Sequence, residues 1–471
     1  MRDKIVFYSQ KISFLLLLIT LLLSPFFLFP NIVLDEHTVL AKKYFVTFSS
    51  IIFLFFFTFY LFFAKKINIT KPVILVLVFA CLTLLSSFNS INVPFSLIEC
   101  LLSLSTIFFF FFSYYLIKDF RNIRKIFFIY IFTASVISII GFLQYFGYDI
   151  LQYPFKYVLT EDEKRFKVLA TLGNPDYLAG YLSPILLILI SIMLTVKKHV
   201  YLFLLLILNV VITLTVLFTE SRANFVGLFI GVIIILVYFY LYRQELPLFK
   251  TFSQKQVRYV SIFLFLFILI GSFIFISTHK SSILNRMKEL LSFKIVGGHK
   301  ERSIFYILAN EMIFDHPFLG VGIGMYKIEY TNYIEKLSTN PSLHKSFDNI
   351  LKSYPNTIAE HAHNDFLEIW AERGSLAFFV FLYILVLFFF QLYHITKDNN
   401  ISSSKRFFSV GIIASMICYF LHAMANFPFH SPERGVLFWV ILSLGFRIGE
   451  LTAENTKKSQ GSQRNKKIEH E

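Results

Sequence analysis

The sequence predicts an all-α membrane protein that crosses the bilayer about twelve times. Hydrophobic residues make up 56% of its 471 residues and charged residues only 15%, and the mean hydropathy is +0.67. Such a composition is too apolar for an ordinary water-soluble globule. Apolar runs long enough to span a membrane recur along the chain, separated mostly by short polar stretches. The aromatic content of 19% suits surfaces that face lipid and the membrane interface.

The predicted spans form a first group of nine and a last group of three. The nine lie within residues 1–277, at about Ile12–Phe29, Tyr44–Ala64, Pro72–Phe88, Leu97–Ile117, Ile126–Gly147, Leu178–Val196, Val200–Phe218, Asn224–Tyr242 and Val260–Ser277. The three lie within residues 375–450, at about Ser375–Ile395, Phe407–Asn426 and Val436–Phe446. The last run is short. If it does not cross the membrane, the number of spans is odd and only the tail changes sides. Residues 451–471 are rich in Lys, Gln, Ser and Glu and are predicted to be a disordered cytoplasmic tail.

The distribution of Lys and Arg predicts the side that each loop faces. With a cytoplasmic N-terminus, most basic residues fall in inner loops, for example Lys65-Lys66, Lys118–Lys125 and Arg243–Arg258, whereas Lys42-Lys43 is the main outer exception. Residues 278–374 then form one large extracytoplasmic loop of a multi-pass protein in the cytoplasmic (inner) membrane. The net charge of +15 is explained by this topology, so no nucleic-acid partner is expected.

This large loop holds most of the polar chemistry of the chain. Arg302 begins a run of helically spaced apolar residues that ends at Phe314, which predicts an amphipathic helix lying on or dipping into the membrane. The following segment, Asp315–Gly322 (DHPFLGVG), is typical of a tight turn and lacks the Lys-Ser/Thr ending of a phosphate-binding loop. The loop closes with His361–Asp365 (HAHND).

Two arginines are candidate binding groups. Arg222 lies in an outer turn of only about five residues, and an arginine deep in the bilayer costs about 2.5 to 3.5 kcal/mol. It is therefore expected at the interface or facing a polar cavity, where a snorkelling anchor or an ion pair with Glu220 is the alternative to a functional role. Arg302 falls in the first turn of the amphipathic helix, where a solvated surface charge is the alternative.

Three short segments supply the other candidates. His361 and His363 form an HxH pair, but no further spacing completes a zinc shell, so no metal and no cofactor are expected. A histidine near the membrane interface suits a general base or a hydrogen-bonding partner of phosphate, with simple packing as the alternative. The outer loops contribute expected substrate-binding residues, although their Pro and Gly also break helices; the full set is His361, Asn364, Asp176, Tyr177 and His430.

In their order and spacing, these motifs resemble the O-antigen ligase family, which also includes polysaccharide polymerases, teichuronic acid enzymes and protein O-oligosaccharyltransferases. The matching features are Ser221-Arg222 at an outer helix junction, Arg302 followed by Asp315–Gly322, and His363-Asn364 separated by nine residues from Gly374. The resemblance extends from about Gly173 to His430, while the first five spans match in hydropathy only.

The resemblance implies a GT-C-like membrane glycosyltransferase that needs no metal. It implies that a glycan on undecaprenyl diphosphate is transferred to a hydroxyl acceptor at the outer face of the cytoplasmic membrane. The acceptor is the lipid A-core of lipopolysaccharide, another glycan or a protein. Arg222 and Arg302 would hold the diphosphate, on which negative charge develops, and His363 would take the proton of the attacking hydroxyl with inversion of the anomeric centre. No carboxylate pair is placed for a retaining double displacement.

Two rival functions stay open. A polymerase of the same family would extend a lipid-linked glycan, and Ala377 stands where ligases tend to have a second glycine three residues after Gly374. A transporter or flippase of lipid-linked sugars would instead line a translocation path with the arginines. Transporters often contain repeated halves with binding groups near the midplane, whereas this sequence shows no such repeat and gathers its candidates at one face.

Overall fold

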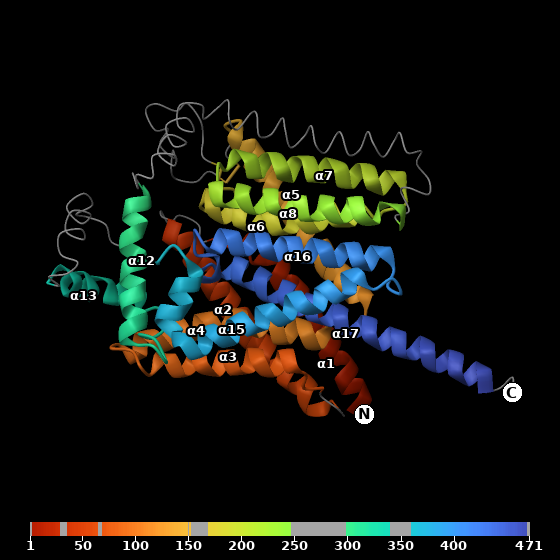
Figure 1. The fold of residues 1–471 in the computed structure, drawn as a ribbon, viewed down its shortest axis with the longest axis horizontal. Helices are drawn as coiled ribbons and strands as arrows, with labels where there is room; N and C mark the ends of the chain where they lie inside the picture. The colour runs from red at the N-terminus through yellow and green to blue at the C-terminus, as the bar shows by residue number, and fades with distance from the viewer. Residues whose placement is uncertain are drawn as a thin grey trace.

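The computed structural model describes residues 2–28, 35–64, 68–148, 150–151, 168–245, 298–339 and 359–468. Within these ranges the chain is helical and has no strand, and ten helices are long and apolar enough to cross a membrane. They run alongside one another in a single bundle (Figure 1). The predicted all-α membrane fold is confirmed.

The helices of the bundle coincide with predicted spans. They are α1 (Arg2–Leu23), α2 (Asp35–Phe63), the shorter α3 (Lys71–Ser87), α4 (Val93–Leu116), α5 (Phe120–Tyr145), α6 (Pro175–Met193), α7 (His199–Phe218), α8 (Arg222–Tyr242), α15 (Asp365–Lys397), α16 (Ser403–Ala423) and α17 (Pro432–Ile468). The predicted span Val260–Ser277 lies outside the described residues. The other described elements are η1 (Arg243–Glu245), α12 (Gly298–Asp315), α13 (Tyr326–Ser338) and η2 (Pro428–His430).

Side-chain caps and prolines fix where several helices begin. Asn92, Asp119 and Asn174 each accept a hydrogen bond from a backbone N–H in the first turn of α4, α5 and α6. Proline occupies the first turn of α3, α4 and α6, where its missing N–H costs no helical hydrogen bond. Local sequence therefore sets these boundaries more sharply than the apolar runs do.

Helices α6, α16 and α17 form the centre of the bundle. In their most apolar stretches 78%, 72% and 78% of the residues are buried, compared with 22% in α7 and 28% in α1, α2 and α8. Helix α16 packs against both α6 and α8, and α17 packs along α4. The outer helices expose large apolar side chains such as Phe62, Val200 and Phe229, as a surface in contact with lipid requires.

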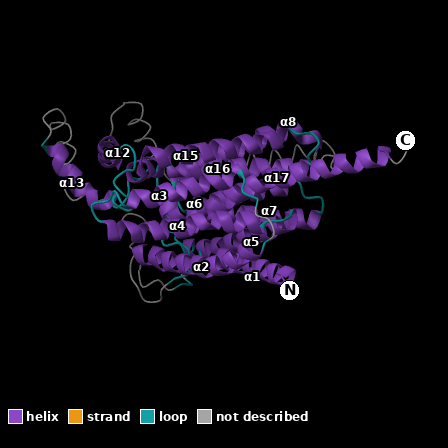
Figure 2. Cartoon of the chain, turned by 90° about the horizontal axis from the view of Figure 1, so that it is seen from below, coloured by secondary structure: helices purple, strands orange, loops and turns teal. Residues whose placement is uncertain are grey.

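Two boundaries differ from the sequence-based expectation. Helix α15 begins at Asp365 rather than at Ser375, because Asn364 caps its first turn and a break at Gly374 lets a polar segment precede the apolar one. Helix α17 continues to Ile468 through the tail predicted to be disordered, and it projects beyond the bundle (Figure 2). The Ala, Glu, Gln and Lys residues of that tail favour helix.

Helix α12 lies across one end of the bundle, roughly perpendicular to the spans, and α13 lies beyond it (Figure 1). The helix predicted after Arg302 is therefore present. It packs against α15 and α13 through buried residues at helical spacing, Ile304, Leu308 and Met312. The same apolar cluster includes Ala359 and Ala362, so it fixes the segment that carries the histidines. Both ends of the chain lie at the opposite end of the bundle.

Gly374 joins the end of the bundle to the turn that follows α12. Its backbone has φ +75° and ψ 174° inside α15, a conformation open almost only to glycine. At this break Ser375 N donates to Pro317 O at 2.8 Å, while Val321 N donates to Ala371 O at 3.0 Å. Two motifs that are far apart in the sequence thus pair through their backbones.

We expect Gly374→Ala to destabilise the protein. The added Cβ would lie 2.2 Å from Phe318 O and 2.5 Å from Leu319 N, and the strained backbone alone costs about 1 to 3 kcal/mol. The measurement is the melting temperature in detergent and the yield of monodisperse protein. Gly298→Ala, at the start of α12, is the control. An unchanged melting temperature for Gly374→Ala would contradict this role of the glycine.

Candidate active site

Three histidines gather around Phe427 at the end of the bundle that carries α12. The His361 ring stacks on the Phe427 ring, with a centroid distance of 4.3 Å and an interplanar angle of 26°. The His363 ring meets the same ring edge-on, at 5.1 Å and 79°. The ring centroid of His430 lies 4.5 Å from that of His361. His361 and His363 therefore touch different sides of one aromatic ring.

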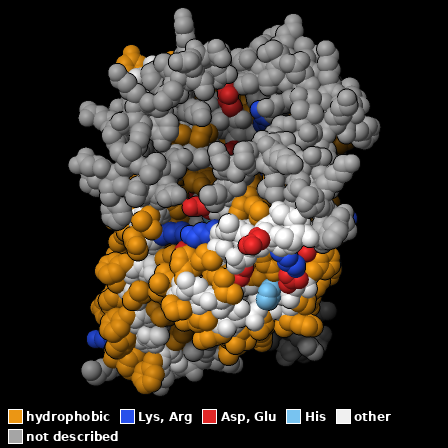
Figure 3. All heavy atoms as spheres, turned by 90° about the vertical axis from the view of Figure 1, so that its left-hand side faces the viewer, with side chains coloured by type: hydrophobic (Ala, Val, Ile, Leu, Met, Phe, Trp, Pro, Cys, Tyr) orange, Lys and Arg blue, Asp and Glu red, His pale blue; other side chains and the backbone are white. Residues whose placement is uncertain are grey.

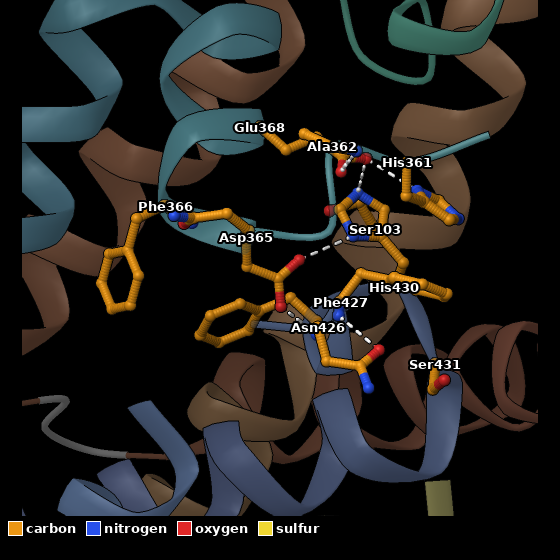
Figure 4. A network of polar contacts seen from close by, with 12 residues as sticks. Ser103, His361, Ala362, Asp365, Phe366, Glu368, Asn426, Phe427, His430 and Ser431 are labelled. Atoms are coloured by element: carbon orange, nitrogen blue, oxygen red, sulfur yellow. Dashed lines mark hydrogen bonds and ion pairs between the residues drawn. The ribbon is translucent and has the colours of Figure 1, made fainter. Parts of the chain in front are cut away.

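Two buried carboxylates of α15 bind two of these histidines (Figure 4). Glu368 Oε1 lies 2.7 Å from His361 Nδ1 and 3.2 Å from His430 Nε2, and its other oxygen accepts from Ala362 N at 2.8 Å. Asp365 Oδ1 lies 2.9 Å from His430 Nδ1, and Asp365 Oδ2 accepts from Phe429 N at 2.9 Å. His430 is thus held between Asp365 and Glu368.

This network gives His430 and His361 different protonation states. Burial alone would lower the pKa of His430, but Glu368 and Asp365 outweigh burial and raise that pKa to about 9. Burial, together with the neighbouring His430 and Lys43, lowers the pKa of His361 well below its ordinary value. At neutral pH His430 is therefore a cation, and His361 is a neutral ring that can donate to Glu368 through Nδ1.

His363 faces α12 instead. Its ring stacks on Phe305 at 5.5 Å, and its Nδ1 is buried with no hydrogen-bond partner among the described residues. Burial first, and the positive charge of Arg302 second, lower its pKa to about 4. Its backbone is left-handed, with φ +53°. His363 is therefore neutral at physiological pH and near the Arg302 guanidinium.

Of the two predicted arginines, only Arg302 interacts with His363 in the structure. Arg222 is exposed at the start of α8, and no contact within the described ranges joins it to Arg302 or His363. It is nevertheless tied to this end of the bundle, because the preceding residue, Ser221, donates through its hydroxyl to Asp176. Asp176 in turn lies near enough to His363 to influence its pKa.

The other predicted residues have structural partners. Asn364 Oδ1 accepts from Phe366 N and Leu367 N at 3.1 and 3.3 Å and so caps α15. Tyr177 packs under the buried Arg434 guanidinium, 4.0 Å from the ring centre. His430 belongs to the carboxylate network. The structure thus brings His361, His363, His430, Arg302 and Asp176 together, while Asn364 and Tyr177 support the surrounding backbone and packing.

A cavity of about 90 Å³ opens beside His361. Its walls come from helices far apart in the sequence, and they carry equal numbers of basic and acidic side chains. The basic ones are Lys43, Lys327, Arg373 and His430, and the acidic ones are Glu99, Glu360, Glu368 and Glu372. On the surface at this end of the molecule, cationic and acidic side chains and a histidine lie among hydrophobic ones (Figure 3).

The site also contains a set of potential metal ligands. One ligand atom from each of His361, Glu368 and His430 lies within 4.8 Å of the others. Two histidines and a glutamate can bind zinc. In this arrangement, however, the protonated His430 already pairs with Glu368 and Asp365, so a metal would have to displace its proton.

A comparison with known families gives a match over part of the chain. Residues 207–382 match the family model described as O-Antigen ligase. Over this segment the chain is similar to the O-antigen ligase family. The earlier resemblance is thereby confirmed over these residues, and it implies a membrane enzyme. The O-antigen ligase domain contains Arg222, Arg302 and His363, while Asp176 and His430 lie outside the matched residues. No curated protein matches the chain.

Sequence reasoning missed several charged residues beside the O-antigen ligase motifs. Asp365, Glu368 and Glu372 recur at helical spacing, so they share one face of α15, and Arg373 follows them. That spacing was a usable signal. It was hidden because the helix was expected to begin only after these residues.

Proposed function

We propose that the protein is a membrane glycosyltransferase that moves a glycan from undecaprenyl diphosphate to a hydroxyl acceptor at the outer face of the cytoplasmic membrane. The observation that carries the proposal is the proximity of Arg302 to a neutral, partly buried His363 at one end of the bundle. The O-antigen ligase match supports the same reaction class. The excess of Lys and Arg in loops assigned to the opposite side supports the outward orientation.

In the proposed reaction the acceptor oxygen attacks C1 of the first donor sugar. The bond between C1 and the phosphate oxygen breaks, and the lipid diphosphate leaves with the electron pair. The hydroxyl proton passes to His363. Arg302, with Arg222 reaching from the start of α8, stabilises the charge that develops on the diphosphate. Attack from the side opposite the leaving group inverts the anomeric centre.

The Arg302–His363 pair links donor binding to base strength. In the free protein, Arg302 helps to lower the pKa of His363 to about 4, which makes the imidazole a weak base. A bound diphosphate would offset the Arg302 charge and raise that pKa toward neutrality, where a general base works best. His363 would then become an effective base only when the donor is in place.

We predict a corresponding pH dependence. The value of kcat/KM should fall below about pH 4, as His363 gains a proton, and above about pH 9, as His430 loses its proton. In Arg302→Ala the acid limb of the pH profile should move to higher pH, because the substitution removes a cation that lowers the His363 pKa. Initial rates from pH 3.5 to 10 measure both limbs. If the acid limb stays at the same pH in Arg302→Ala, Arg302 does not lower the His363 pKa.

The charge on His430 should also affect stability. Because folding raises the His430 pKa from 6.5 to about 9, its stabilising contribution is complete below pH 6.5 and is lost as the pH rises through about 9. Melting temperatures of the wild type should fall over that range. The fall should be smaller in His430→Gln, and an equal fall in both proteins would contradict the assignment.

We predict that metal chelation leaves the rate of transfer unchanged, because the carboxylates near His361 are already paired with the protonated His430. Purified protein would be incubated with EDTA and assayed before and after addition of Zn²⁺. Strong inhibition that Zn²⁺ reverses would instead assign the His361, Glu368 and His430 cluster as a metal site.

The deciding experiment is a transfer assay with purified protein, a lipid-diphosphate glycan and candidate acceptors. Covalent product supports a transferase, whereas vesicle-to-lumen movement of the lipid-linked glycan without a new linkage would show a flippase. A ladder of lengthening lipid-linked products would identify the polymerase alternative, and a single transfer to a different acceptor would identify a ligase.

A further inference from the structure

The cavity beside His361 has a distinct position relative to the proposed donor site. His361 lies on its wall and stacks on Phe427, while the His363 ring lies at 79° to Phe427 and stacks on Phe305 of α12. Arg302, also on α12, influences His363. His361 therefore faces the cavity, whereas His363 faces α12 and Arg302.

We propose that this cavity binds one uncharged sugar unit of the acceptor, an inference that rests on the proposed transferase function. The cavity offers hydrogen-bonding groups that the protein leaves unused. Ser103 lies on the wall, and its Oγ accepts from Arg373 Nη2 at 3.0 Å. A hydroxyl that accepts one hydrogen bond can still donate its own proton, so Ser103 can bind an oxygen of a bound sugar. His361, bound to Glu368 through Nδ1, leaves Nε2 for a second hydroxyl.

The charges on the wall favour a neutral ligand. Four glutamates balance the four basic side chains, so a phosphate placed beside any cation would also meet a carboxylate. On this wall, Lys43 Nζ and Glu99 Oε2 are 3.5 Å apart and already pair. Sugar hydroxyls both donate and accept, so a polyol can use carboxylates and cations together through charge-assisted hydrogen bonds.

The size of the cavity sets the length of the ligand. At about 90 Å³ it has room for roughly six water molecules, which corresponds to one sugar ring rather than a chain. The side chains of the wall are also tightly packed against each other, since a Cβ added at Gly324 would lie 2.5 Å from Glu99 Cγ. The rest of the acceptor must therefore extend out of the cavity past its exposed wall residues, Lys327 and Glu360.

Kinetics would test the proposal with Glu99→Gln and Ser103→Ala. The donor would be lipid-linked glycan extracted from the producing cells, and the acceptor probe would be the uncharged oligosaccharide that mild acid releases from it. We expect the KM for the oligosaccharide to rise about tenfold with the KM for the donor unchanged. Glu335→Gln, an exposed glutamate on α13, is the matched control. A rise in the donor KM alone, or no change in either KM, would overturn the proposal.

Chemical labelling would test the cavity without turnover. Ser103→Cys and Glu99→Cys would be made in a Cys81→Ser background, since Cys100 and Cys418 are buried. Oligosaccharide at about twice its dissociation constant should slow maleimide labelling about threefold, and inorganic phosphate should not. If oligosaccharide protects the cysteines but no glycan transfer is found, the proposed function is wrong and the binding site still stands. Equal protection by phosphate, or no protection by oligosaccharide at either cysteine, would overturn the site.

Discussion

Replacing Arg302 by alanine is expected to slow glycan transfer by about two to three orders of magnitude, the usual effect of removing one group that stabilises developing charge. In the structure Arg302 is the cation that acts on His363, so its loss removes both the clamp on the leaving diphosphate and the control of the base. The measurement is kcat at saturating donor, corrected for the amount of protein in the membrane.

Two further variants define the role of the Arg302 charge. Arg302→Lys should recover only part of the rate, because a point charge cannot grip two phosphate oxygens as the planar guanidinium does. Arg222→Ala should cause a loss of similar size if Arg222 reaches the same diphosphate. Arg121→Ala is the matched control, since the Arg121 side chain is 82% exposed at the start of α5. Near-normal turnover in either alanine variant would show that the substituted arginine does not belong to the active site.

Replacing His363 should abolish most activity, because it is the proposed base and its neutral ring stacks on Phe305 of α12, the helix that carries Arg302. His363→Asn is a sharper test than His363→Ala. The residue has φ +53°, a conformation that asparagine tolerates better than most residues, so the backbone is preserved while the base is lost. Transfer rate and melting temperature would be measured together, and loss of rate with an unchanged melting temperature is the expected result.

His361→Ala should reduce transfer less than His363→Ala, and mainly by weakening acceptor binding. His361 faces the cavity and is held by Glu368, so it is placed to bind a hydroxyl rather than to meet the phosphate. His394→Ala, at an exposed position in the last turn of α15, is the control. If His361→Ala were the more damaging change, the proton acceptor would be the histidine on the cavity side.

The fold could be predicted from the sequence because apolar run length is a strong signal for membrane helices. Each span predicted within the described ranges is a helix, including Pro72–Phe88, which became the short α3. The first ten residues of α15, before Ser375, were missed because Asp365, Glu368 and Glu372 look like loop residues when hydropathy alone is read. Asp365 is held by Phe429 and His430, and Glu368 by His430, which come about 60 positions later in the chain.

The candidate site could be predicted only in part. HxH spacing marked His361 and His363, and the amphipathic pattern placed Arg302 at a helix start, but neither says which histidine meets which partner. That depends on the left-handed backbone at His363 and on the ring of Phe427, both of which are tertiary features. Arg434 and Lys42 were also missed, because a fully buried cation next to Tyr177 or a backbone carbonyl leaves no local pattern.

The central position of α17 has a consequence for biosynthesis. This helix fills the middle of the bundle against α4 and α6, yet it is synthesised after all the other described helices. Until Pro432 and the residues after it emerge, the inner face of α6 has only lipid or other helices to cover it. A nonsense mutation or C-terminal truncation before Pro432 would therefore leave every earlier helix present but the assembly without its core, and membrane quality-control proteases would be expected to remove the shortened chain.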